Sequence, residues 1–218
     1  GPNTRVIGLS GSLAFGSVPV GSTSNRTMTI VNSGNSALTV SSISYPPGFT
    51  GAWSGSIPAG SSQNVTVAFA PWSMATYGDT VTVSSDWTDG KSTIVASGTG
   101  IPTAPPAVVT NPIPAHLSTG IATNRSLSWA ASARVMGYRV HFGTSANPPF
   151  IQTQVTTNFS TNMVKGTLYY WRIDATNTLG VTTGDVWQFT TTAPCYDDWI
   201  AQVTNGLTNC NQSATRDG

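Results

Sequence analysis

The sequence contains no glutamate and few charged residues of any kind. Charged side chains make up 8% of the 218 residues, against roughly a quarter in an average soluble protein. Histidine occurs only twice, so the side chains that most often act as general acids and bases are scarce. No G-x-S-x-G sequence, which marks one common type of serine nucleophile, is present. We therefore assign no catalytic residue, no metal and no cofactor, and we do not expect an enzyme.

A charge imbalance and a long apolar run are also missing. Nine basic and eight acidic residues leave a net charge of +1, which is too small to attract nucleic acid or an anionic membrane surface. No stretch approaches the length of apolar sequence that a transmembrane helix needs. We expect neither nucleic acid as a partner nor insertion into a membrane.

Short segments of alternating apolar and polar residues fill residues 13–100. In TMTIVN the apolar positions are Met28 and Ile30, and the segments NVTVAF and TVTVSS alternate in the same way. This period of two is typical of strands with one buried and one solvated face. Turn-forming stretches such as NSGNS and PAGSS separate the segments. The pattern predicts an antiparallel β-sandwich.

The same alternation returns in residues 107–193, for example in YYWRIDA, where Tyr169, Trp171 and Ile173 share one face. Between the two regions lies the proline-rich stretch GIPTAPPAVVTNPIP, a composition that stays extended. The predicted fold class is all-β, with two immunoglobulin-like sandwiches in tandem. They occupy residues 1–100 and 107–193, with a linker at residues 101–106.

Several motifs of the first region resemble a known family. LAFGSVPVG, the NSGN turn, IPAG followed by NVTVAFAP, and the closing SGTG are similar to the choice-of-anchor D type of Hydin-like (ASH) domain, over roughly residues 12–100. The resemblance implies a non-catalytic immunoglobulin-like sandwich. Trp72 and Trp87 depart from the family pattern, because small residues are usual at both places.

The second region resembles bacterial fibronectin type III domains in NPIPAHLSTGIATNRSLSWAAS, YRVHFGTSANPPF, GTLYYWRIDATNTLG and DVWQFTT. The resemblance implies that Trp129 lies in the core of strand B, that Tyr169 forms the tyrosine corner before strand F, and that Phe189 closes the core from strand G. Domains of this type host many functions, so the resemblance indicates the fold and not the activity.

The last segment, residues 194–218, loses the alternation. Trp199 and Val203 are spaced as on one face of a helix, which predicts one short helix in this tail. Cys195 and Cys210 flank the helix, and a disulfide between them would stabilise the tail by about 3 kcal/mol. A bridge favours an oxidising compartment, whereas two unpaired thiols in a reducing compartment are the alternative.

Trp72 and Trp87 are candidates for contact with a ligand, because sugar rings stack on tryptophan faces. Their alternative role is to close the open ends of the sandwich. The nearby sequence SSDWTDGK also places Asp86 and Asp89 beside a glycine. Two carboxylates are too few for a calcium site, and Asp-Gly supplies the backbone angles of a hairpin turn. We predict a hairpin turn at residues 88–91.

Strand parity turns a row of polar side chains outward on the second sandwich. The row consists of Arg139, His141, Tyr170, Arg172 and Asp174. The two strands that carry them pair in a fibronectin-type sheet, so these residues are expected on one face. The simplest interpretation is a solvated face with an Arg–Asp pair and an arginine stacked on tyrosine. The alternative is a contact patch for a protein or a glycan.

The sequence as a whole indicates a non-catalytic structural or interaction module. We expect a spacer, a stalk or an assembly subunit within a larger secreted or cell-surface bacterial protein. Its partners would be other domains of that protein or neighbouring surface proteins. The alternative is a polysaccharide-binding accessory module of an extracellular enzyme. Any enzymatic chemistry would have to lie outside this chain.

Overall fold

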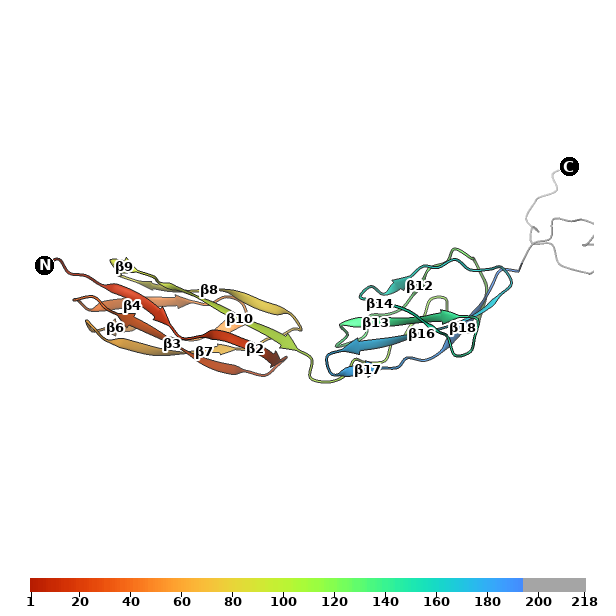
Figure 1. Cartoon of the computed structure of the whole chain (residues 1–218), viewed down its shortest axis with the longest axis horizontal. Coiled ribbons are helices and arrows are strands. Elements are labelled where there is room, and N and C mark those ends of the chain that lie inside the picture. Colours follow the sequence, from red (N-terminus) through yellow and green to blue (C-terminus); the bar gives the residue numbers. More distant parts are fainter. Residues whose placement is uncertain (194–218) are drawn as a thin grey trace, which may run out of the picture. The chain divides into compact units, whose positions relative to one another are not determined.

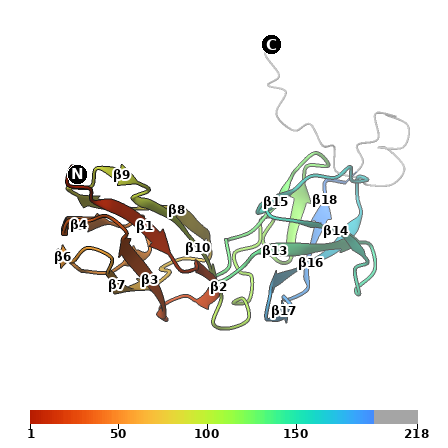
Figure 2. The ribbon, with the colours of Figure 1, turned by 60° about the vertical axis from the view of Figure 1, so that its left-hand side comes forward.

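The computed structural model describes residues 1–193, and their regular structure consists of β-strands (Figure 1; Figure 2). The chain divides into two compact units with the boundary between Ala104 and Pro105. Each unit folds around its own hydrophobic core, so the prediction of two all-β domains in tandem is confirmed. No helix in residues 1–193 has the length and hydropathy needed to cross a membrane.

The first domain is a sandwich of two five-stranded sheets. One sheet has the order β5 (Phe49–Thr50), β7 (Ser62–Phe69), β3 (Ser24–Asn32), β1 (Val6–Ser10) and β9 (Asp89–Gly90). The other has the order β2 (Leu13–Pro19), β10 (Thr93–Ile101), β8 (Thr76–Ser85), β4 (Leu38–Ser44) and β6 (Gly55–Ile57). Most neighbours are antiparallel, but β1 pairs with β9 and β2 with β10 in parallel.

The alternating positions of the first domain form its core, as their pattern predicts. Met28 and Ile30 of β3 are fully buried, together with the valines of β7 and β8 that share their parity. A cluster of aromatic rings closes one part of the core, with centroids 4.7 to 5.6 Å apart. Its members are Phe15, Phe49, Phe69 and Tyr77. Burying one such side chain stabilises the fold by about 1.5 to 3 kcal/mol.

The Asp-Gly pair at residues 89–90 does not make the predicted hairpin turn. It forms the short strand β9, which pairs in parallel with the start of β1 through Val6 and Ile7. The reason is that β8 continues to Ser85 and pairs there with β4, so the chain turns back later through a wider loop. Gly90 has a φ of +109°, and a Cβ at this position would overlap the carbonyl oxygen of Ile7.

The second domain contains one large sheet and one small sheet. The large sheet has the order β11 (Ser118–Ile121), β18 (Trp187–Thr191), β16 (Leu168–Asn177), β13 (Gly137–Gly143) and β14 (Phe150–Gln154), with β17 (Gly180–Thr182) paired to β16. The small sheet consists of β12 (Leu127–Ser128) and β15 (Asn158–Phe159). Every pairing is antiparallel except that of β11 with β18.

Tryptophans occupy the centre of the second core. Trp171 is fully buried, with its ring centroid 6.4 Å from that of Trp129 and 4.8 Å from that of Trp187. The hydroxyl of Tyr169 accepts a hydrogen bond of 2.9 Å from the backbone N–H of Val164, which is the contact of a tyrosine corner. Trp129, Tyr169 and the buried Phe189 therefore lie where the fibronectin resemblance places them.

Both domains absorb part of the predicted linker at residues 101–106. Ile101 is still paired in β10. At the other end, the carbonyl oxygen of Pro105 accepts a 3.1 Å hydrogen bond from Arg134, and that of Pro106 accepts one of 2.7 Å from Thr182. The predicted tail helix and the Cys195–Cys210 bridge lie outside the described residues.

Candidate functional site

The outward polar row of the second domain does gather on one face of the large sheet. Strands β13 and β16 pair so that Arg139 is opposite Asp174 and His141 is opposite Arg172. The expected solvation of this face is wrong, however, for two of its members. His141 is only 8% exposed and Asp174 only 4%.

Asp174 is the centre of a buried ionic cluster, formed with His141 and Arg172. The guanidinium of Arg172 donates from Nε to Oδ1 at 2.8 Å and from Nη2 to Oδ2 at 3.2 Å. The ring nitrogen Nε2 of His141 lies 3.1 Å from Oδ2, and the backbone N–H of Gly184 donates to Oδ1 at 3.1 Å. Both carboxylate oxygens are therefore satisfied, as a buried carboxylate requires.

Two loops account for the burial of this cluster. The turn before β14 brings the carbonyl oxygen of Pro148 to 3.3 Å from His141 Nδ1 and sets the ring of Phe150 edge-on to the imidazole, with centroids 5.7 Å apart. The segment after β17 covers Asp174 from the other side, where Gly184 donates its hydrogen bond. Strand parity indicates which face of a sheet a side chain occupies, but it does not indicate whether a loop covers that face.

The other two members of the outward polar row, Arg139 and Tyr170, remain accessible to solvent. Arg139 is exposed, and its guanidinium carbon lies 5.4 Å from the ring centroid of Phe150, a cation–π contact. The expected stacking of an arginine on tyrosine is thus replaced by stacking on a phenylalanine of the neighbouring strand. Tyr170 is half-buried and lies between Gly143 of β13 and Gln188 of β18.

The geometry of the ionic cluster does not suit nucleophilic catalysis. A Ser-His-Asp arrangement needs a hydroxyl on the imidazole nitrogen that the carboxylate leaves free. In this domain Nδ1 of His141 faces the carbonyl oxygen of Pro148 instead. The other histidine, His116, accepts a hydrogen bond of 3.1 Å from the backbone of Gln188 through its Nδ1. Both histidines therefore make structural contacts.

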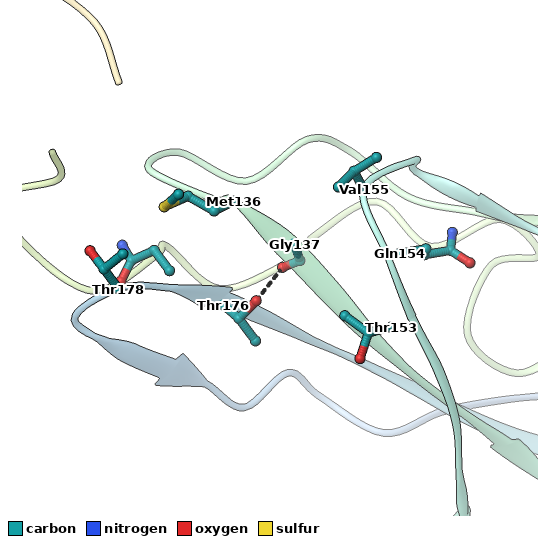
Figure 3. A pocket seen from close by; sticks show the side chains of 8 residues that line it. Met136, Gly137, Thr153, Gln154, Val155, Thr176 and Thr178 are labelled. Carbon is teal, nitrogen blue, oxygen red and sulfur yellow. Dashed lines mark hydrogen bonds between the residues drawn. The ribbon is translucent and has the colours of Figure 1, made fainter. Parts of the chain in front are cut away.

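An open depression of about 390 Å³ lies at the N-terminal end of β13 (Figure 3). It is on the same face of the large sheet as the outward polar row. Its floor is Gly137, whose carbonyl oxygen accepts a hydrogen bond of 3.0 Å from the Thr176 hydroxyl. Met136 and Val155 border it with exposed apolar side chains, and Thr153 borders it from β14. The sequence contains no motif for this feature, because its walls combine the consecutive strands β13 and β14 with the end of β16.

The two candidate tryptophans of the first domain are both exposed, Trp72 to 64% and Trp87 to 42%. Trp72 packs against the edge of Tyr77, with centroids 5.0 Å apart, in the loop before β8. Trp87 follows the end of β8. A strand advances about 3.3 Å per residue, so this long strand separates the two rings by roughly 30 Å. They cannot stack on neighbouring sugar units as one platform.

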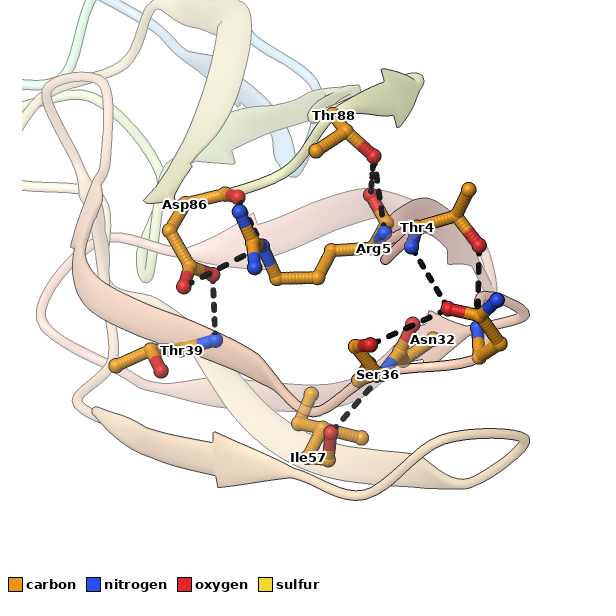
Figure 4. Close-up of polar contacts among 9 residues, drawn as sticks. Thr4, Arg5, Asn32, Ser36, Thr39, Ile57, Asp86 and Thr88 are labelled. Atoms are coloured by element: carbon orange, nitrogen blue, oxygen red, sulfur yellow. Dashed lines mark hydrogen bonds and ion pairs between the residues drawn. The ribbon is translucent and has the colours of Figure 1, made fainter. Parts of the chain in front are cut away.

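Polar contacts fix the loop that carries Trp87 (Figure 4). Arg5 donates from Nε to the carbonyl oxygen of Asp86 at 2.7 Å and lies 3.5 Å from its carboxylate. The same carboxylate accepts a hydrogen bond of 2.7 Å from the backbone N–H of Thr39, and the Asp89 carboxylate accepts one of 2.7 Å from Gly90. Within the described residues, no three His, Cys, Asp or Glu side chains lie close enough together to hold a metal ion.

Sequence reasoning did not identify Asn32 as an important residue. Its side chain is fully buried, and Nδ2 donates to the carbonyl oxygens of Ser36 at 2.8 Å and Ile57 at 3.0 Å. Its Oδ1 accepts a hydrogen bond of 3.1 Å from the backbone N–H of Gly34. One amide therefore holds the turn after β3 against the end of β6. The sequence feature that could have identified it is the NSGN motif, whose first asparagine is Asn32.

Comparison with known proteins identifies the first domain. Residues 6–99 match the family model of the HYDIN/CFA65/VesB-like, Ig-like domain. The match begins at β1, a strand that the sequence resemblance did not include. No curated protein matches the chain.

Several solved structures are similar to parts of the chain. The ASH/PapD-like domain 7 of human CEP192 shares 15% identity at a TM-score of 0.39, covering 46% of this chain and 89% of that one. The Vibrio cholerae VesB protease shares 17% identity at a TM-score of 0.33, over 42% of this chain and 30% of the protease. The titin Ig tandem A164-A165 shares 9% identity at a TM-score of 0.44, covering 87% and 98%.

The family model extends from the first residue of β1 into β10 and so covers both sheets of the first domain. Residues 6–99 are therefore an immunoglobulin-like domain of the HYDIN/CFA65/VesB-like family.

Proposed function

We propose that this chain is a non-catalytic structural and interaction module of a larger secreted or cell-surface bacterial protein. Its two sandwiches would act as a spacer, a stalk or an assembly subunit. The observation that best supports this proposal is that the histidine and aspartate side chains described above make structural hydrogen bonds. Both histidines, Asp86 and Asp174 make contacts that hold loops to strands. Few acid or base groups are left for chemistry on a substrate.

The extracellular location rests on composition rather than on geometry. Charged residues are rare and hydroxyl-bearing residues abundant, and the two cysteines near the end of the chain would form a disulfide in an oxidising compartment. Intact mass before and after reduction tests this part of the proposal. A mass increase of two hydrogens on reduction supports it, and an unchanged mass removes the argument from the cysteines.

A mechanical experiment tests the spacer role directly. A spacer must transmit force, so each domain should unfold as one cooperative unit when the chain is stretched from its two ends. We expect single-molecule pulling to give two discrete unfolding events per chain. Extension of either domain without a discrete event would contradict the proposal.

A second candidate function, a polysaccharide-binding accessory module, is favoured only by the exposure of Trp72 and Trp87. Because the rings lie at opposite ends of β8, each would act alone. The test is co-sedimentation of the dilute chain with insoluble cellulose, chitin and peptidoglycan. Binding that is lost in Trp72→Ala or Trp87→Ala would establish this function, whereas we expect the chain to stay in solution. Hydrolysis of any of these polymers would overturn both candidates.

A further inference from the structure

The sheet edges of this protein differ in how well they are protected. In the first domain the edge strands β5 and β9 contain two residues each, and β6 contains three. The longer edge strand β2 ends at Pro19 and has a register shift near Gly16, where φ is +67°. Short strands, prolines and bulges are the usual means of preventing contact between sheet edges. These edges are therefore poor templates for another strand.

Strand β14 in the second domain is protected much less. It pairs only with β13, and its residues are exposed apart from the half-buried Gln154. Phe150, Ile151 and the neighbouring Val155 place apolar side chains on the surface. A register shift at Ile151 is its one irregularity, and Gln152 to Gln154 pair regularly. No charged residue occurs between positions 140 and 164, so the usual protective lysine is absent.

The surroundings of β14 suit a second copy of the same strand. An antiparallel pair centred on Thr153 would set Gln152 of one copy opposite Gln154 of the other, and would bring Ile151, at the register shift of one copy, beside Val155, which directly follows β14 in the other. Val155 borders the depression over Gly137, so the isoleucine of the partner copy would lie beside an apolar hollow. Gln152 and Gln154 already bond to each other at 2.8 Å within one strand, and they can exchange these bonds across the pair. Strand β14 itself carries no charge, and the nearest cation on this face is Arg139 of β13, which is opposite Thr153 and stacks on Phe150 of its own copy.

We propose that the β14 edge is a homotypic contact, at which two copies of this chain add their edges into one continuous sheet. Main-chain hydrogen bonds would provide the attraction, and the hollow beside Val155 would select an aliphatic side chain. A five-residue edge buries little area, so the contact is weak in dilute solution. It becomes effective where copies are held together at an effective concentration of about 1 mM. This inference names a partner for the interaction module proposed above and rests on that proposal.

Sedimentation velocity of the whole chain, from about 10 µM to about 1 mM, tests the contact in the range where small interfaces dissociate. A reductant keeps the cysteines from linking copies. The test variant is Ile151→Lys, which adds a charge to the edge. The matched control is Val95→Lys, because Val95 is also exposed, at 68%, but lies in the first domain, where it pairs with Thr80 of β8 in the interior of a sheet order. Circular dichroism checks that both variants fold.

We expect reversible association of the native chain, weakened at least tenfold by Ile151→Lys, which corresponds to about 1.4 kcal/mol. Val95→Lys should change it by less than about twofold, as a surface substitution outside the contact does. Hydrogen exchange should also show that the amides of residues 150–154 become protected as concentration rises. A chain that stays monomeric at the highest concentration would overturn the proposal, and so would equal weakening by both variants.

The same data separate this inference from the proposed function. Polysaccharide binding and hydrolysis are measured at low concentration, where the chain is monomeric, and the pulling experiment uses single molecules. A monomeric chain that shows two unfolding events would refute the β14 contact and leave the spacer role standing. A chain that binds or cleaves a polymer would refute the proposed function whatever its state of association.

Discussion

Replacing Asp174 by alanine should destabilise the second domain strongly. The substitution removes the acceptor of two hydrogen bonds from Arg172, of the contact from His141 and of the N–H of Gly184. It leaves a guanidinium and an imidazole crowded together, with Arg172 Nη2 only 3.3 Å from His141 Nε2.

The expected cost follows from the burial of this cluster. Removing one partner of a buried ion pair costs about 3 to 5 kcal/mol, because the remaining charge stays desolvated. The Arg172 side chain is 19% exposed, so water reaches it in part. We therefore expect about 3 kcal/mol for Asp174→Ala and about half as much for Asp174→Asn, whose amide oxygen still accepts one or two of these bonds.

Urea and thermal unfolding, followed by tryptophan fluorescence and circular dichroism, measure this loss. For a domain of this size, about 3 kcal/mol corresponds to a decrease of roughly 12 to 24 °C in the melting temperature of the second domain. The transition of the first domain should not move, because the substituted residue belongs to the other compact unit. Asp185→Asn is the matched control, since Asp185 is exposed and the change of charge is the same.

A small effect would refute the reasoning. If Asp174→Ala costs less than about 1 kcal/mol, the cluster is solvated in solution, as the sequence interpretation supposed. A double-mutant cycle with Arg172→Ala provides an independent check. A coupling energy near zero would mean that the 2.8 Å contact contributes nothing to stability.

Three further substitutions have expected outcomes. Asn32→Ala should destabilise the first domain by about 2 to 3 kcal/mol in urea unfolding, because buried carbonyl oxygens lose their donor, whereas the exposed Ser33→Ala should have little effect. Gly90→Ala should lower the free energy of unfolding clearly more than Gly60→Ala, since both positions have a positive φ but only a Cβ at position 90 meets other atoms. Equal losses would show that β9 can move away from β1 to make room for the Cβ. Burial raises the pKa of Tyr45 above its usual 10.0, so the neutral hydroxyl is favoured by folding and stability falls as pH rises above about 10. Tyr45→Phe should reduce this alkaline loss, and a variant with an unchanged pH profile between about pH 8 and 11 would contradict the assignment.

The fold was predictable because each half-buried strand leaves a local record. Met28 and Ile30, or Tyr169 and Trp171, alternate with polar residues since successive side chains point to opposite faces of a sheet. Strands without such a record were missed. The segment VIGLS was not recognised as β1, and the Asp-Gly pair became β9, because its pairing with β1 depends on a segment more than 80 residues away.

The candidate site was predictable only in part. Parity correctly placed Arg139, His141, Arg172 and Asp174 on one face, since paired strands keep a constant register. It did not predict that Pro148 and Gly184 would cover the middle of that face. The sequence did not predict the separation of Trp72 from Trp87, because it depends on the length and direction of β8. It did not predict the depression over Gly137 either, because this depends on how three strands end beside one another.

Composition and periodicity alone were sufficient to establish two all-β domains, their core residues and the scarcity of catalytic groups, because these properties depend on each residue and its immediate neighbours along the chain. The burial of His141 and Asp174, the bonds of Asn32 and the exposure of β14 depend on contacts between distant segments. Loop paths determine which polar groups lose their water and which sheet edge stays open. The solvated patch expected on the second domain is consequently an internal ionic cluster, and the accessible surface lies beside it, at the edge formed by β14.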